Sequence, residues 1–182
     1  MPKLIGLLGK SGSGKSVVAN WLTENREYKE FAFAAALKDA CKIIFGLTHE
    51  QLYGGLKDTY DSFYCCTPRH ILQQVGCGLF RDELPHVLPE LPLHDKSVWI
   101  LHFDKIFAAA TVPIVVSDVR FMNEAKNIKE KGGVLIRIIR PSVLEYTDSH
   151  CSETESDGIE HDYCIVNDGD IDDLHRQLYT LF

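Results

Sequence analysis

An α/β fold around a parallel, five-stranded sheet is predicted by three features of this 182-residue chain. Apolar segments of strand length alternate with amphipathic segments of helix length, an order that builds a parallel sheet with helices on both faces. The segment VPIVVSD is apolar almost throughout, as is typical of a strand buried on both faces. A glycine-rich turn separates the first strand from the first helix. Ligands of such folds bind outside the carboxyl ends of the strands, so a site is expected in the turns that follow them.

The glycine-rich turn lies in GLLGKSGSGKS, residues 6–16. Gly9, four further residues and then Gly14, Lys15 and Ser16 match the phosphate-loop pattern G-x-x-x-x-G-K-[ST]. Glycines allow successive backbone N–H groups to point at a polyphosphate, and the following helix adds its positive N-terminal end. A flexible Gly/Ser linker is the alternative, but a linker would not stand between a buried strand and an amphipathic helix. The pattern therefore predicts a nucleotide site.

This phosphate loop supplies most of the predicted ATP-binding residues. Lys15 can reach the β- and γ-phosphates, and the Ser16 hydroxyl can ligate Mg²⁺. Arg140 and His150 flank a polar loop at 141–160 that we expect to close over ATP as a lid and exclude water. The predicted ATP-binding set is Gly9, Lys10, Ser11, Gly12, Ser13, Gly14, Lys15, Ser16, Val17 and Arg140.

The composition narrows the range of partners. The formal net charge of −7 argues against nucleic acid, because that binding depends on basic surface. No apolar stretch approaches twenty residues, so no membrane span is expected. The six cysteines show no C-x-x-C spacing and no signal peptide is apparent, so we expect reduced thiols and a cytoplasmic protein. A zinc site from Cys65, Cys66 and His70 is a minor alternative.

The remaining elements are predicted from hydrophobic spacing, within a single domain whose residues 48–110 are mostly helical. Thr67 is a favourable N-cap and Pro68 a favourable first residue for one of these helices. The expected strands cover 3–8, 31–33, 112–118, 133–139 and 162–166. The expected helices cover about 14–25, a segment directly after 33, 68–83, about 96–110, 122–131 and the C-terminal segment. Their apolar faces are expected at Val17, Val18, Trp21 and Leu22; at Leu37, Cys41, Ile44 and Phe45; at Ile71, Leu72, Val75 and Leu79; and at Ile171, Leu174 and Leu178.

Charged residues near the ends of elements are further candidates. Asp118 ends a buried strand, where a carboxylate commonly holds Mg²⁺ or its waters beside a phosphate loop; a helix-capping role is the alternative. Arg120 lies on the same rim and could bind phosphate as a planar fork. Lys38 and Asp39 are placed at the start of the helix after the second strand, and Arg69 at the start of the 68–83 helix. Each residue alone could simply be a surface charge, but together these positions favour a second, acceptor phosphate site.

The chain resembles the phage-type deoxynucleoside monophosphate kinases, a branch of the P-loop kinases. The similarity is carried, in order, by ALKDA (36–40), LTHEQLYGGLKD (47–58), TPRHILQQVGCGLFRD (67–82), SDVRFMNEA (117–125), GGVLIRIIRP (132–141), HCSE (150–153) and VNDGD (166–170). This resemblance implies a three-layer P-loop kinase fold with a helical acceptor-binding insertion. It also implies transfer of the ATP γ-phosphate to a deoxynucleoside 5′-monophosphate for DNA precursor synthesis, with Mg²⁺.

The resemblance also implies roles for individual residues. The acceptor-binding set is Lys38, Asp39, Arg69, Gln73, Trp99, Arg120, Glu124 and Glu153. Lys15, Arg120 and Asp118 are the catalytic candidates, and Ser16 and Asp118 are the metal candidates. Cys77 and Gly78 depart from the family pattern, because Gly-Thr-Glu or Gly-Thr-Asp is common there. A homodimer is left open.

A nucleoside monophosphate needs no dedicated general base, because its second pKa is about 6 and its oxygens are already nucleophilic at neutral pH. The expected mechanism is therefore alignment of two phosphates and neutralisation of their charge. The segment NDGD (167–170) is expected to hold adenine, or else simply to form a turn and helix cap. Two other functions compete: a P-loop kinase for another small acceptor, such as a phosphomevalonate-like compound or a coenzyme precursor, and a nucleotide-dependent switch or ATPase.

Overall fold

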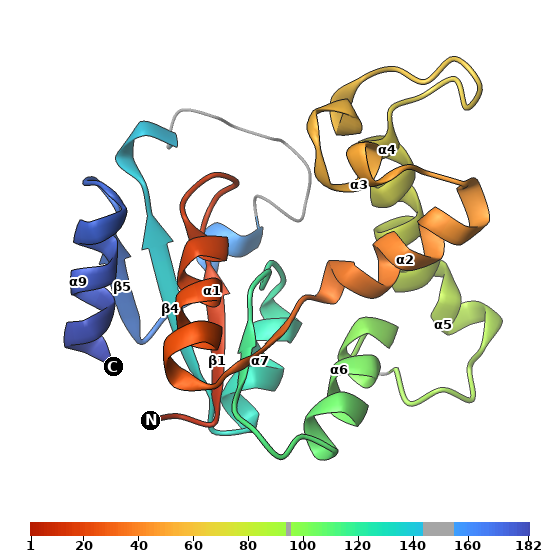
Figure 1. Ribbon diagram of the computed structural model, residues 1–182. Helices are drawn as coiled ribbons and strands as arrows, with labels where there is room; N and C mark the ends of the chain where they lie inside the picture. The colour runs from red at the N-terminus through yellow and green to blue at the C-terminus, as the bar shows by residue number, and fades with distance from the viewer. Residues whose placement is uncertain (94–95, 144–154) are drawn as a thin grey trace. The chain divides into compact units, whose positions relative to one another are not determined.

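The computed structural model describes residues 1–93, 96–143 and 155–182, and the chain divides into two compact units (Figure 1). The first unit combines residues 1–32 with residues 104–182, and the second contains residues 33–103. The predicted helical region, 48–110, overlaps most of the second unit. That the whole chain acts as one domain stays a prediction.

The first unit is built on the predicted parallel, five-stranded sheet, with the strand order β2-β3-β1-β4-β5. Every neighbouring pair of strands is parallel. The central strand β1 is buried along its whole length, which explains its apolar sequence LIGLL. The strands are β1 (Leu4–Leu8), β2 (Lys29–Phe31), β3 (Ile114–Val116), β4 (Val134–Ile139) and β5 (Tyr163–Val166).

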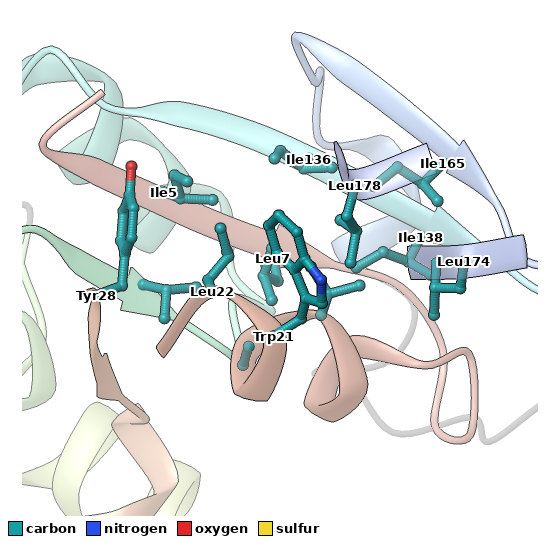
Figure 2. Close-up of a cluster of buried hydrophobic side chains, with 13 residues drawn as sticks. Ile5, Leu7, Trp21, Leu22, Tyr28, Ile136, Ile138, Ile165, Leu174 and Leu178 are labelled. Atoms are coloured by element: carbon teal, nitrogen blue, oxygen red, sulfur yellow. The ribbon is translucent and has the colours of Figure 1, made fainter. Parts of the chain in front are cut away.

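Two helices cover one face of this sheet, α1 (Lys15–Arg26) and α9 (Ile171–Leu181). Figure 2 shows the cluster between them and the strands, in which Trp21 and Leu22 of α1 and Leu178 of α9 meet apolar strand side chains. The strand residues of the cluster include Ile5, Leu7, Val115, Ile136, Ile138 and Ile165. Successive strand side chains point to opposite faces, so these residues leave a second face for another layer.

The helix α7 (Met122–Glu130) covers that second face. A Cβ added at Gly6 of β1 would lie 2.8 Å from Cδ1 of Ile128 on α7 and 2.7 Å from Cδ2 of Leu135 on β4. Glycine at position 6 therefore allows close packing of β1 against α7, and a larger residue would have to displace these side chains. The first unit has the predicted three layers: α1 with α9, the sheet, and α7.

The second unit is helical and has its own small core. Cys41, Leu47, Leu52, Ile71 and Leu72 are buried together. Its elements are α2 (Phe33–Phe45), α3 (His49–Tyr53), the 3₁₀ turn η1 (Gly55–Asp58), α4 (Pro68–Gln73), the π-helical segment η2 (Gln74–Glu83), α5 (Leu84–Val87) and the first part of α6 (Val98–Ala108). Thr67 caps α4 by accepting a hydrogen bond from the His70 N–H, and Pro68 is its first residue, as predicted.

Two predicted boundaries were wrong. The second strand lies at Lys29–Phe31 rather than 31–33, and α2 begins at Phe33, so Lys38 and Asp39 lie inside this helix rather than at its start. The cause is the apolar run FAFAAA, which shows no composition change at the true junction. The predicted 68–83 helix is α-helical only to Gln73 and continues as η2.

Three residues predicted to belong to apolar faces are exposed: Ile44 by 66%, Leu79 by 51% and Ile171 by 56%. For Leu79 the reason is the π-helical winding, because i→i+5 hydrogen bonds rotate later side chains away from the face that a 3.6-residue period predicts. Ile171 is the first residue of α9, where a side chain can extend beyond the layer below.

The polar segment predicted as a lid contains two short 3₁₀ turns, η3 (Pro141–Val143) and η4 (Glu155–Gly158). Two residues named for this segment, His150 and Glu153, lie outside the described residues. Within the residues that are described, no helix is both long and apolar enough to cross a membrane.

Candidate functional site

The phosphate loop connects β1 to α1 through backbone conformations that favour glycine. Gly9, Gly12 and Gly14 have φ angles of +142°, +78° and +109°. At Gly9 an added Cβ would meet the Ile138 carbonyl oxygen and lie 2.7 Å from Oγ of Ser13. No side chain caps the start of α1 at Gly14. The first N–H groups of α1 are thus not taken by a capping side chain, as an anion site at a helix N-terminus requires.

Lys15 is held over this loop by the backbone. Its Nζ donates to the carbonyl oxygens of Gly9, at 2.6 Å, and Lys10, at 2.8 Å. The Lys10 carbonyl also accepts from the Ser13 N–H at 3.1 Å. The ammonium group is therefore positioned by main-chain carbonyls of the loop that it would serve, before any phosphate binds.

Lys10 pairs with a carboxylate from the far end of the sequence. Its Nζ lies 2.7 Å from Oδ2 of Asp157 in η4, and the side chain of Asp157 is 55% exposed. The segment around Asp157 is fixed in turn by Arg137 of β4, which donates to the carbonyls of Ser156 and Ile159 at 2.8 Å each. Lys10 is one of the predicted phosphate ligands, so a bound phosphate would have to compete with Asp157 for it.

Asp118 follows β3, the strand beside β1. The β1–β3 register pairs Gly6 with Val116, and its continuation brings Asp118 level with Leu8, directly before the phosphate loop. The alternative that Asp118 caps the next helix was wrong, because the N-cap position of α7 is Phe121. Arg120 lies on the same rim, at the carboxyl edge of the sheet.

Glu124 holds the turn that carries Arg120. Its Oε2 accepts from the N–H groups of Arg120, at 2.9 Å, and Phe121, at 3.2 Å, and the residue is only 2% exposed. The next N–H, that of Met122, donates to Oε1 of Glu155 at 2.7 Å. Two carboxylates therefore fix the backbone at the start of α7.

The oxygen donors near the loop suit Mg²⁺. Ser16 is an exposed hydroxyl in the first turn of α1, and Asp118 is a half-buried carboxylate at the same edge of the sheet. Mg²⁺ is commonly held by one or two protein oxygens, with waters and substrate phosphates completing its octahedron. Among the described ranges, no three His, Cys, Asp or Glu side chains come together as a metal cluster. Cys65, Cys66 and His70 therefore do not form the zinc site considered above.

In the second unit, two predicted acceptor cations contact one short segment. The Lys38 ammonium lies 3.9 Å from the ring centroid of Tyr53, at the end of α3. Arg69 forms a two-pronged ion pair with Asp58 of η1, in which Nη2 donates to Oδ2 at 2.9 Å. The hydrogen bond from Arg69 lowers the pKa of the Asp58 carboxyl. The partial burial of Tyr53, followed by the charge of Asp39, raises the pKa of its phenol.

The other acceptor candidates of this unit differ in exposure. Asp39 is exposed and Gln73, the last residue of α4, is half-buried. Trp99 packs edge-on against Phe80, and its indole N–H donates to the Gly76 carbonyl at 3.2 Å. In the first unit, Arg140 follows β4 and is exposed.

Sequence reasoning missed four residues that bear on these sites: Asp157, Tyr53, Asp58 and Asn167. Tyr53 and Asp58 both lie within LTHEQLYGGLKD (47–58), one of the segments that carry the family resemblance. That resemblance could have indicated both residues. Asn167 belongs to the segment NDGD, which the sequence predicted only to hold adenine or to form a turn and helix cap. Its side-chain amide donates to the Ser13 carbonyl of the phosphate loop at 2.9 Å. The capping alternative for this segment was confirmed at Asp170, whose side chain caps α9 by accepting from the Asp173 N–H.

Comparison with known proteins gives a family match and several structural neighbours. The family model described as deoxynucleotide monophosphate kinase matches residues 93–178. A putative deoxynucleotide monophosphate kinase of Acanthamoeba polyphaga mimivirus is 41% identical over 97% of this chain and 94% of its own length. A shikimate kinase from Aquifex aeolicus is 16% identical, covering 98% and 95% of the two chains with a TM-score of 0.44. A gluconokinase from Sinorhizobium meliloti is 17% identical, covering 99% and 95% with a TM-score of 0.46.

Proposed function

The chain belongs to the deoxynucleotide monophosphate kinase family, and we propose that it transfers the γ-phosphoryl group of ATP to a deoxynucleoside 5′-monophosphate. The observation that carries the proposal is the phosphate loop, in which Lys15 is held by two loop carbonyls beside a helix start that no side chain caps. The family match supplies the acceptor class, which the loop alone does not indicate.

The donor side of the proposed reaction is electrostatic. The loop N–H groups and Lys15 bind the β- and γ-phosphates, and Arg120, on the rim after β3, neutralises charge on the transferred group. Ser16 and Asp118 would hold Mg²⁺, which neutralises phosphate charge when bound. Glu124 serves this site by fixing the backbone of Arg120, since its carboxylate accepts from that residue's own N–H.

The acceptor side uses Lys38 and Arg69 of the second unit. Arg69 presents a planar fork that matches phosphate oxygens, and it already binds the carboxylate of Asp58 in that manner. The acceptor phosphate is mostly a dianion at neutral pH, because its second pKa is about 6. It can therefore attack without a protein base, and the protein's task is to align donor and acceptor.

The test is a substrate panel on the full chain with Mg²⁺ and ATP. ADP release and thermal shift are measured with dGMP, dTMP, dUMP, dCMP and dAMP, and with ribonucleotides, mevalonate 5-phosphate and dephospho-coenzyme A as competitors. At a hundredfold excess over Kd, a bound acceptor should stabilise the fold by about 2.7 kcal/mol. We expect at least one deoxynucleotide both to raise the melting temperature and to accelerate ADP release. A response confined to a non-nucleotide acceptor would overturn the substrate class, and ATP binding with no acceptor response would favour a switch.

A further inference from the structure

The side chain of Asn167 joins two segments that lie far apart in the sequence. Asn167 directly follows β5, and its own N–H donates to the Ile139 carbonyl at the end of β4, at 2.7 Å. Its Nδ2 donates to the carbonyl of Ser13, in the middle of the phosphate loop, at 2.9 Å. Asn167 is 7% exposed and Ser13 is 1% exposed. The hydrogen bond is therefore shielded from water, where losing a partner is expensive.

This bond fixes the orientation of one peptide unit. The first hydrogen bond of α1 runs from the Val18 N–H to the Gly14 carbonyl, so the Ser13 carbonyl lies outside the helix ladder. The peptide bond between Ser13 and Gly14 is planar and trans, so its C=O and N–H point in opposite directions. With the Ser13 carbonyl directed at Asn167, the Gly14 N–H is directed away from Asn167.

The close fit between these groups depends on glycine at position 14. A Cβ added to Gly14 would lie 2.6 Å from Nδ2 of Asn167. Gly14 also has a φ of +109°, a conformation that glycine adopts at little cost. Glycine peptides reorient easily, and the hydrogen bond from Asn167 restricts this peptide to one orientation.

We propose that Asn167 is a positioning residue for phosphate binding: it holds the Ser13–Gly14 peptide so that the Gly14 N–H faces the nucleotide phosphates. Without it, the peptide can turn and present the Ser13 carbonyl to the phosphates, which repels them. This inference rests on the proposed nucleotide site. Holding adenine would be a different role. The Asn167 amide is directed at the loop backbone, so its effect should be the same for any polyphosphate, with or without a nucleobase.

The test compares ligands with and without a base. Affinities of ATP, GTP and inorganic tripolyphosphate, each with Mg²⁺, are measured by calorimetry for the unaltered chain and for Asn167→Ala. We expect the variant to lose about tenfold in affinity for all three ligands, the size of one buried hydrogen bond. A loss confined to ATP would overturn the proposal in favour of base recognition, and unchanged affinities would overturn it outright.

Gln177→Ala is the matched control. The Gln177 amide donates to the Val166 carbonyl, one residue before Asn167, at 2.9 Å, and it does not bind the phosphate loop. We expect this variant to keep all three affinities within about twofold, which separates positioning of the loop from general weakening of β5. A loss in Gln177→Ala equal to that in Asn167→Ala would overturn the proposal.

One further variant and the affinities of the unaltered chain keep the outcomes separable. Should Asn167→Ala fail to fold, the three affinities are measured for Asn167→Ser instead. A loss for all three ligands would again support the proposal, and unchanged affinities would again overturn it. If the unaltered chain binds neither ATP nor tripolyphosphate, the proposed nucleotide function itself fails. If it binds both but Asn167→Ala retains full affinity, only the role of Asn167 fails.

Discussion

The two groups of candidate cations are held in different ways. In the first unit, Lys15 contacts main-chain carbonyls of its own loop, and the loop is supported by buried groups such as Asn167. In the second unit, Lys38 contacts an aromatic ring and Arg69 contacts a carboxylate, and both of these partners are exposed side chains. Apart from the Lys10–Asp157 pair, the phosphate loop is therefore held by its own backbone and by buried groups, whereas Arg69 would have to exchange Asp58 for a phosphate in the proposed reaction. Binding at the loop should need less reorganisation than binding at the acceptor cations.

The largest effect is expected from Lys15→Ala. Removing a charge aimed at the developing phosphate charge should lower phosphoryl transfer by at least about a hundredfold. The fold should persist, because the β1–α1 core does not use this side chain. Circular dichroism and coupled ADP release measure the two properties.

The control for charge alone is Lys126→Ala, whose side chain is 67% exposed on α7. It should keep normal activity. A folded Lys15→Ala variant with near-normal turnover would contradict the phosphate-loop assignment.

Arg69→Ala should impair the acceptor side alone. Losing a charged hydrogen bond to phosphate should raise the acceptor KM by about thirtyfold while ATP affinity barely changes. Asp58→Asn sharpens the comparison, because it removes the group that competes for Arg69 and should lower that KM by a few fold.

Steady-state kinetics and ATP calorimetry measure these changes. Lys42→Ala removes an exposed cation from the same unit and should alter neither constant. An equal loss of ATP affinity in Arg69→Ala would place this arginine at the donor site instead.

Asp118→Asn should raise the Mg²⁺ concentration needed for half-maximal activity by about tenfold, because the carboxylate would hold the ion or its waters. A Mg²⁺ titration of ADP release measures the shift. Glu130→Gln, which neutralises an exposed carboxylate on α7, should leave the titration where it is. An unchanged titration in Asp118→Asn would leave this residue without a metal role.

The smallest effect concerns stability, and it compares one carboxylate from each unit. Lys129 lowers the pKa of Asp162 by a hydrogen bond from its ammonium group, and the Leu135 N–H lowers it further. A lowered pKa in the folded state stabilises the fold above the unfolded value of 3.8, and this contribution disappears as the pH falls through the folded value. Asp162→Asn should therefore reduce the unfolding free energy by about 0.5–1 kcal/mol at pH 7.

Urea denaturation at pH 7 and at about pH 3 measures this contribution. The difference between Asp162→Asn and the unaltered chain should shrink at the lower pH. Asp58→Asn should change stability less, because the Asp58 side chain is 63% exposed against 33% for Asp162. If Asp162→Asn and the unaltered chain differ in unfolding free energy by the same amount at both pH values, the charge of Asp162 does not contribute to stability.

The central features of the first unit could be predicted because they are local in sequence. The phosphate loop combines a glycine spacing with an apolar strand before it and an amphipathic helix after it. β3 is a continuous apolar run, so its burial was predictable. In the second unit, Thr67 and Pro68 are likewise local helix-start signals, and they predicted the start of α4.

What could not be predicted depends on contacts between distant segments or on the winding of a helix. Asp157 meets Lys10 across 147 residues, and Asn167 meets Ser13 across 154 residues. No pattern within either segment indicates its partner. The segment after Gln73 is π-helical, and a 3.6-residue period does not anticipate that winding, so it placed Leu79 on the wrong face.

The order of strands in the sheet has a consequence for synthesis on the ribosome. β1 is made first but lies at the centre of the sheet, and its neighbours β3 and β4 begin at residues 114 and 134. The second unit is continuous in sequence and is complete at residue 103. Local contacts form faster than distant ones, so we expect the helical unit to fold while β1 still waits for its partners. During that interval the apolar strand LIGLL lacks its neighbours in the sheet, so we expect the nascent first unit to be more prone to aggregation than the second.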